Sequence, residues 1–184
     1  MKLKSLGLLV ALGMVAFSAG AVEKMRLGHG LPEDHAVHKA VVRFADLVKE
    51  RTNGEVVISV FANGVLGNER EMLEQVQNGV LEITKASASP LETFSPDYKV
   101  FNLPFVFRDR EHFFNVLTSP VGESILASSK KSGFIGLAYY DSGARSFYGK
   151  KAVNTPDDLK GLKIRVQQSP TTIRSEERRV GKEC

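Results

Sequence analysis

Two arginines in the second half of the chain have the chemistry and placement of an anion site. Arg165 lies on the polar face of LKIRV (162–166), and the next helix is expected to begin at Ser169 and Pro170. Ligands of open α/β sheets bind beyond strand carboxyl ends, helix N-termini favour anions, and guanidinium groups pair bidentately with carboxylates. This favours a carboxylate site at Arg165, with a surface salt bridge as the alternative. Arg145, after a glycine turn, is a candidate for a second anion contact.

Histidines gather in the first part of the chain. His35 and His38 stand three residues apart near an expected helix start, and only His29 is close by. A metal pair here would need a third and a fourth ligand. We therefore interpret these histidines as solvent-facing or helix-capping, and we expect neither a metal nor a cofactor.

Sequence signatures of an enzyme are mostly missing. The chain has no GxSxG, P-loop or HExxH motif, and GHGLPED lacks the third glycine of a phosphate-binding loop. No pair of titratable residues is arranged as nucleophile and base. We expect a protein that is not an enzyme. An exported enzyme using Glu69 or His29 as its base is the competing hypothesis, and it predicts turnover.

The elements that would position these residues alternate between strand and helix patterns. Strands are expected in 24–30, 55–64 and 80–87, and helices in 35–54 and 66–79. This β-α-β-α-β order is typical of a sheet covered by helices. The continuous apolar residues of the second strand indicate burial on both of its faces.

A second series of elements follows in the chain. Helices are expected in 108–117 and 119–133, with N-caps at Asp109 and Ser119, and a one-turn helix in NTPDDLKG with its cap at Thr155. FIGLAYYD (134–141), ARSFYG (144–149) and LKIRV (162–166) are expected strands.

The amino terminus predicts export. Lys2 and Lys4 precede an apolar run from Leu6 to Phe17, which ends in small residues, and cleavage is expected between Ala21 and Val22. The run is shorter than the about 20 residues that span a membrane. We expect residues 1–21 to be a signal peptide and the mature protein to lie in the periplasm, without stable membrane insertion.

Composition narrows the class of partner. The 42% apolar and 25% charged residues are those of a globular protein. Of the formal charge of +4, the two leader lysines carry two units and residues 174–184 a net one, which leaves +1 for the body. A nucleic-acid or membrane-surface function therefore loses its main support.

The only cysteine is Cys184, so the body must rely on an ordinary hydrophobic core.

Three blocks of sequence identify a family resemblance. FANGVLGNEREMLEQVQNGVLEIT, FNLPFVFRDREHF and TPDDLKGLKIRVQQSP, in this order, resemble the solute-binding proteins of tripartite ATP-independent periplasmic (TRAP) transporters, of the dicarboxylate-binding type. The resemblance covers about 24–173. It implies a two-lobe α/β periplasmic binding protein fold (type II-like), with the first lobe in 22–140 and the start of the second in 141–173.

The resemblance also implies site residues and a function. Arg165 would pair with the ligand carboxylate, and Arg145 and Gln168 would add contacts. From the first lobe, His29 with Gly30, Glu69 and Ser87 align with ligand-facing positions, and Ser87 favours a smaller ligand than some sugar acids. The implied function is capture of a small carboxylate, such as a C4-dicarboxylate, and its delivery to a TRAP membrane permease. The binding component of an ATP-driven importer, or a sensor on a related fold, is the alternative.

The carboxyl-terminal residues 174–184 do not continue the pattern of the body. RSEERRVGKEC interrupts an expected helix, and its back-translation resembles a common sequencing-library adapter. Because family members are about twice this length, we expect a chain truncated to most of the first lobe and the start of the second, with a non-native tail. We also expect that this truncated chain does not bind ligand and that it is prone to aggregation, because strand edges and apolar surface are exposed.

Overall fold

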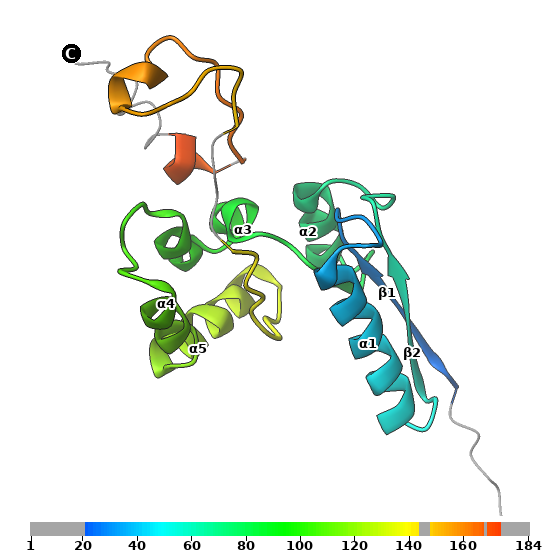
Figure 1. Ribbon diagram of the computed structural model, residues 1–184. Helices are drawn as coiled ribbons and strands as arrows, with labels where there is room; N and C mark the ends of the chain where they lie inside the picture. The colour runs from blue at the N-terminus through cyan, green and yellow to red at the C-terminus, as the bar shows by residue number, and fades with distance from the viewer. Residues whose placement is uncertain (1–20, 144–147, 168, 174–184) are drawn as a thin grey trace, which may run out of the picture.

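The computed structural model describes residues 21–143, 148–167 and 169–173 (Figure 1). Residues 1–20 of the expected leader 1–21 and the tail in 174–184 lie outside these ranges, as do Arg145 and Gln168. Within the described ranges, every helix is too short or too polar to cross a membrane.

Three parallel strands form a sheet in the order β2-β1-β3. β1 (Glu23–Gly28) pairs along its whole length with β2 (Val56–Phe61). β3 (Ile83–Thr84) is only two residues long and pairs with the last two residues of β1. The expected β-α-β-α-β unit is confirmed, and all three strands end at the same edge of the sheet.

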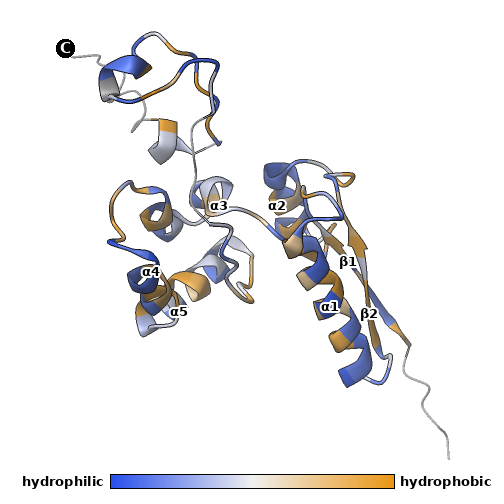
Figure 2. Cartoon of the chain, viewed as in Figure 1, coloured by the Kyte–Doolittle hydropathy of each residue, from blue (hydrophilic) through white to orange (hydrophobic). Residues whose placement is uncertain are grey.

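The helix α1 (Ala36–Arg51) packs its apolar stripe against β1 and β2, as Figure 2 shows. The core of this unit consists of buried apolar side chains from both strands and the helix: Leu27, Val37, Val41, Ala45 and Ile58. Val56 and Val60 pack against it, whereas Ser59 is exposed on the other face of β2. Burial of both faces of β2 was therefore a wrong prediction, because in this structure its one well-packed face is the one under α1.

The side chain of His35 caps α1. The backbone N–H of Val37 donates to His35 Nδ1 at 3.1 Å, which satisfies a donor that has no partner within the helix. The interpretation of this histidine as a helix cap is confirmed.

Local side-chain chemistry sets the start of α2 (Glu69–Gln77). Asn68 Oδ1 accepts from the N–H of Glu71 at 3.1 Å, and Glu71 Oε2 accepts from the N–H of Asn68 at 2.8 Å, which is a capping box. Met72, fully buried, packs over the end of β1. A Cβ on Gly28 would lie 2.7 Å from its sulfur, so a larger residue here would force the Met72 side chain to move.

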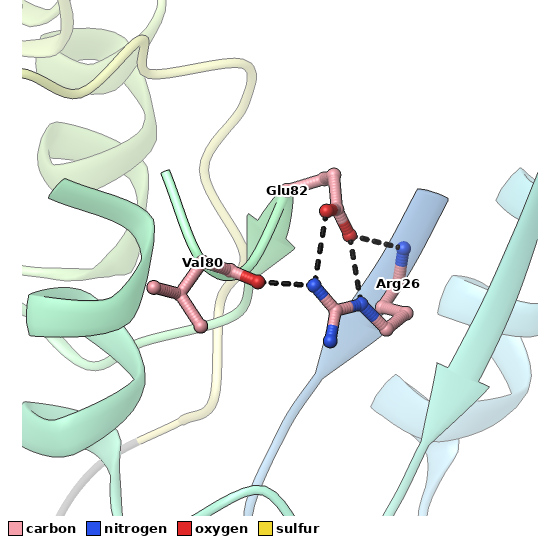
Figure 3. A network of polar contacts seen from close by, with 3 residues as sticks. All are labelled: Arg26, Val80 and Glu82. Carbon is pink, nitrogen blue, oxygen red and sulfur yellow. Dashed lines mark hydrogen bonds and ion pairs between the residues drawn. The ribbon is translucent and has the colours of Figure 1, made fainter. Parts of the chain in front are cut away.

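A side-chain network connects the short β3 to β1 (Figure 3). Glu82 Oε2 accepts from the backbone N–H of Arg26 at 2.8 Å and from its Nε at 3.2 Å, and Oε1 accepts from its Nη2 at 3.1 Å. Nη2 also donates to the carbonyl of Val80. These hydrogen bonds from Arg26 lower the pKa of Glu82. The carboxylate thus extends the β1–β3 pairing beyond the two residues of β3.

A helical region follows the sheet. It contains α3 (Ala88–Phe94), the 3-10 helix η1 (Pro96–Asn102), α4 (Arg110–Leu117), α5 (Pro120–Ser128) and a 3-10 turn at Ser129–Ser132. The expected caps of α4 and α5 are confirmed, since Asp109 accepts from the N–H of His112 at 2.7 Å and Ser119 from that of Val121 at 3.2 Å. The sequence patterns did not predict α3 and η1.

Two of the expected strands, 134–141 and 162–166, are wrong. Neither segment forms regular secondary structure or pairs with a strand among the described residues. In the first segment, the ring of Phe134 packs edge-on against that of Phe94, with the ring centroids 5.5 Å apart. Ile135 and Leu137 are 77% and 65% exposed. A strand requires a hydrogen-bonded neighbour, and no described segment runs beside these two. Part of 144–149 lies outside the described residues.

The expected one-turn helix is confirmed as the 3-10 helix η3 (Pro156–Leu159). Asp158 Oδ2 accepts from the N–H and the hydroxyl of Thr155 at 2.8 and 3.0 Å. These hydrogen bonds, together with one from the N–H of Asn154, lower the pKa of Asp158.

Replacement of Gly122 should destabilise the α4–α5 pair. A Cβ at this position would collide with the backbone carbonyls of Val116 and Leu117, which cannot rotate away. Gly122→Ala is expected to lower the free energy of urea unfolding by about 2 kcal/mol. Gly30→Ala is the control, because a Cβ on Gly30 meets nothing within 4 Å, and it should change stability by less than about 0.5 kcal/mol. Equal stability of the two variants would contradict this account.

Candidate functional site

The shared edge where the three parallel strands end holds a group of polar side chains. His29 directly follows β1, Lys85 directly follows β3, and Glu69 is the first residue of α2. The backbone is closely connected here: the N–H of His29 donates to the carbonyl of Phe61 at 3.0 Å, and that of Lys85 to the carbonyl of Gly28 at 3.1 Å. The carboxyl edge is where ligands bind in open α/β sheets.

Glu69, Lys85 and Ser87 form one hydrogen-bonded group, which we call the edge cluster. Glu69 Oε1 accepts from the Ser87 hydroxyl at 3.0 Å and from Lys85 Nζ at 3.3 Å. The Lys85 and Glu69 side chains are only 12% and 25% exposed, so their charges are shielded from bulk water more than those of a surface pair. The structure thus brings Glu69 and Ser87 together, as two of the residues predicted for the site.

Lys85 is the member of the edge cluster that the sequence analysis missed. Its only signal in the sequence is a cation near the end of the predicted strand 80–87, between Thr84 and two small residues. With Lys85 included, the cluster offers a carboxylate that accepts hydrogen bonds and an ammonium and a hydroxyl that donate them. Such a mixed set can contact hydroxyl, keto and carboxylate groups.

His29 is fully buried, and both of its ring nitrogens take part in hydrogen bonds. Its Nδ1 accepts from the N–H of Leu31 at 3.2 Å, so in the neutral ring Nε2 carries the proton and donates to His38 Nδ1 at 3.0 Å. Burial, followed by the nearby His38 and Lys85, lowers the pKa of His29. The ring therefore holds the loop after β1 in place, and its contact with a ligand stays a prediction.

The arginine predicted to pair with a carboxylate is solvent-exposed. Arg165 alternates with the half-buried Ile164 and Val166, so it lies on the open face of its extended segment. The expected helix start after it is confirmed: helix begins at Pro170, and Ser169 Oγ accepts from the N–H of Thr172 at 3.0 Å. Arg145 and Gln168 are outside the described residues, so their predicted grouping with Arg165 stays a prediction.

Metal-binding groups do not converge in the described part of the chain. No three His, Cys, Asp or Glu side chains there are placed to hold a metal ion. The His29–His38 pair is a hydrogen-bonded couple with its ring centroids 5.1 Å apart.

A parallel α/β unit with a polar cluster at its carboxyl edge is the architecture of a lobe of a solute-binding protein. The family model described as bacterial extracellular solute-binding protein, family 7, matches residues 27–178. The chain belongs to this family, and the predicted family resemblance is confirmed.

Relatives and solved structures agree with the family. A 2,3-diketo-L-gulonate-binding periplasmic protein of Escherichia coli is 36% identical over 178 residues, which are 94% of this chain and 54% of that protein. A TRAP solute-binding protein from a Bradyrhizobium species, in complex with galacturonate, is 42% identical with a TM-score of 0.83, over 86% of this chain and 53% of that one. A TRAP solute-binding protein from Sulfurospirillum deleyianum, with bound succinate, is 30% identical with a TM-score of 0.81, over 87% of this chain and 52% of that one.

These neighbours have the two-lobe α/β periplasmic binding protein fold, so the predicted fold class is confirmed. The chain spans about half the length of the curated relatives it matches. The family and its neighbours are extracytoplasmic solute receptors.

The burial of His29 makes the stability of the protein depend on pH. Its folded pKa lies below the ordinary value of about 6.5, so the unfolded chain takes up the proton first as the pH falls. The contribution of neutral His29 to the free energy of unfolding is therefore complete above about pH 6.5, and it is lost as the pH falls through the folded pKa of His29. The free energy of urea unfolding should decrease from about pH 7.5 to about pH 5.

The variant His29→Asn should show a smaller decrease over the same range. The amide oxygen of asparagine can still accept from the N–H of Leu31, whereas the side chain does not titrate. The measurement is the slope of unfolding free energy against pH. An identical slope for variant and wild type would show that His29 does not cause the acid sensitivity.

Proposed function

We propose that the protein is an extracytoplasmic receptor that binds a small carboxylate solute and delivers it to a TRAP-type membrane permease. The observation that carries the proposal is the meeting of Glu69, Lys85 and Ser87 at the carboxyl edge of the sheet. Solved family members with bound galacturonate and succinate support the ligand class.

Each lobe has its own part in the proposed binding. Arg165, which is solvent-exposed, would pair with the ligand carboxylate through two parallel hydrogen bonds. Arg145 and Gln168 would add contacts from the same lobe. The edge cluster would contact the remainder of the ligand, and closure of the lobes is favoured by contacts available only in the closed state.

The edge cluster favours a ligand with hydrogen-bond donors at its far end. The Glu69 carboxylate accepts from hydroxyl groups and repels a second carboxylate, although Lys85, 3.3 Å away, reduces that repulsion. Hydroxy acids and keto acids therefore join C4-dicarboxylates as candidates. Ser87, which is short and already donates to Glu69, still favours the smaller members of this group.

The proposed place of action is the periplasm, after cleavage between Ala21 and Val22. The receptor would bind and release its ligand without chemical turnover and without a cofactor. The partners would be the ligand and the permease subunits, with no role for nucleic acid.

The ligand class can be tested with the full-length protein, cloned from genomic DNA that extends past codon 173. A thermal-shift screen with C3–C6 dicarboxylates, keto acids and sugar acids should raise Tm for at least one small carboxylate, because a ligand that binds only the folded state stabilises it. Uptake of that acid should disappear on deletion of the neighbouring permease genes. Retained uptake would favour an ATP-driven importer or a sensor, and conversion of the acid to product would favour an enzyme.

The role of Arg165 can be tested in the same full-length protein. Arg165→Lys keeps the charge but loses the bidentate geometry, so Kd for the carboxylate should rise by about tenfold or more. Arg43→Lys is the control, because Arg43 is exposed on α1, away from the carboxyl edge. Isothermal titration calorimetry measures both. Equal Kd values for Arg165→Lys and wild type would exclude Arg165 as the carboxylate partner.

A further inference from the structure

The buried carboxylate of Glu92 joins three segments of the chain. Glu92 belongs to α3 and is only 2% exposed. Its Oε2 accepts from Asn102 Nδ2, at the end of η1, at 2.7 Å. Its Oε1 accepts from the backbone N–H of Thr171 at 2.9 Å, in the first turn of the helix that begins at Pro170. This helix start lies beside α3 in Figure 1.

The surrounding hydrogen bonds require two acceptor atoms at position 92. The hydroxyl of Ser89 donates to Asn102 Oδ1 at 2.8 Å, and Asn102 Nδ2 also donates to the carbonyl of Ala88 at 3.2 Å. The amide of Asn102 is therefore oriented with its donor toward Glu92. On the other side, the N–H of Thr171 can only donate. A carboxylate satisfies both neighbours, whereas an amide would turn a donor against one of them.

The same contact completes the start of the helix at Pro170. The fully buried Ser169 caps this helix through the N–H of Thr172 at 3.0 Å, and Glu92 takes the N–H of Thr171. A carboxylate at a helix start forms a strong charge-assisted hydrogen bond and interacts favourably with the helix dipole. Arg165 stands only four residues before Ser169, so the position of this helix start limits where the arginine segment can lie.

The helix α3 is in turn attached to the rest of the first lobe. Ser132 Oγ donates to the carbonyl of Phe94 at 2.6 Å, and Gln77 Nε2 donates to the carbonyl of Ser132 at 2.8 Å. Gln77 ends α2, the helix that begins with Glu69. Hydrogen bonds therefore connect α2 with α3, and Glu92 connects α3 with the helix start that follows Arg165.

We propose that Glu92 is a positioning residue for the carboxylate site: it holds the segment that carries Arg165 at a fixed place against α3. The effect on ligand affinity rests on the proposed function above. The attachment of the Thr171 helix start to α3 does not, and it is tested separately.

Hydrogen exchange at the Thr171 amide tests the attachment in the full-length protein. Glu92→Gln should accelerate this exchange by about tenfold or more, since the Thr171 amide loses its charged acceptor and the glutamine has a single acceptor oxygen for two donating neighbours. Glu74→Gln is the matched control, because Glu74 is half-exposed on α2 and forms an ion pair only with Arg70 among the described residues, and it should leave the exchange at Thr171 unchanged. Unchanged exchange in Glu92→Gln would overturn the proposal.

Ligand affinity in the full-length protein tests the positioning role. Glu92→Gln should raise Kd for the carboxylate by about tenfold, and Glu92→Asp, which keeps the charge on a shorter side chain, should raise it less. Val41→Ala removes buried volume from the core under α1 and should lower Tm without changing Kd. An increase in Kd no greater than that of Val41→Ala would show a merely structural role. If the wild type binds no carboxylate, the proposed function fails, and the exchange at Thr171 still decides whether Glu92 attaches the helix start.

Discussion

The parallel pairing of β1 with both of its neighbours is the constraint on which the rest of the structure depends. Parallel strands cannot be joined by a tight turn, so the chain must cross back through α1 and α2 before each new strand. Each crossing returns the chain to the amino edge, so that every strand ends at the same carboxyl edge and residues far apart in the sequence meet there. The edge cluster exists because Glu69 begins one of these crossings and Lys85 follows the strand at its end.

Elements with their own start signals could be predicted from the sequence, whereas elements held by distant partners could not. Asn68 and Asp109 satisfy the first N–H groups of their helices, so α2 and α4 begin where local chemistry requires. The helix α3 has no side-chain cap hydrogen bond and depends on Asn102, beyond its own end. The segment from Phe134 shows the opposite error: its continuous apolar run indicates a strand, yet a strand also needs a neighbour that a local pattern cannot supply.

The site was predictable to a similar extent. Family resemblance pointed to Glu69 and Ser87, and the structure places them 3.0 Å apart. The family resemblance gave no indication of Lys85. A lysine at the end of a strand is common on protein surfaces, and its burial depends on how α2 packs. The sequence analysis also treated His29 as a ligand contact or a base, whereas the structure uses both of its nitrogens to hold the loop after β1. Burial and tautomer follow from tertiary packing, which residue types alone do not specify.

The geometry of Glu69 has a consequence for the rate of ligand capture. In the described part of the chain, both of its side-chain contacts fall on Oε1, so Oε2 can accept from an incoming hydroxyl while Lys85 and Ser87 stay bound. In the receptor proposed above, ligand entry would then not have to wait for this ion pair to break and for its charges to be rehydrated. The activation barrier to association would contain lobe motion and ligand desolvation, without a contribution from rearrangement of the edge cluster.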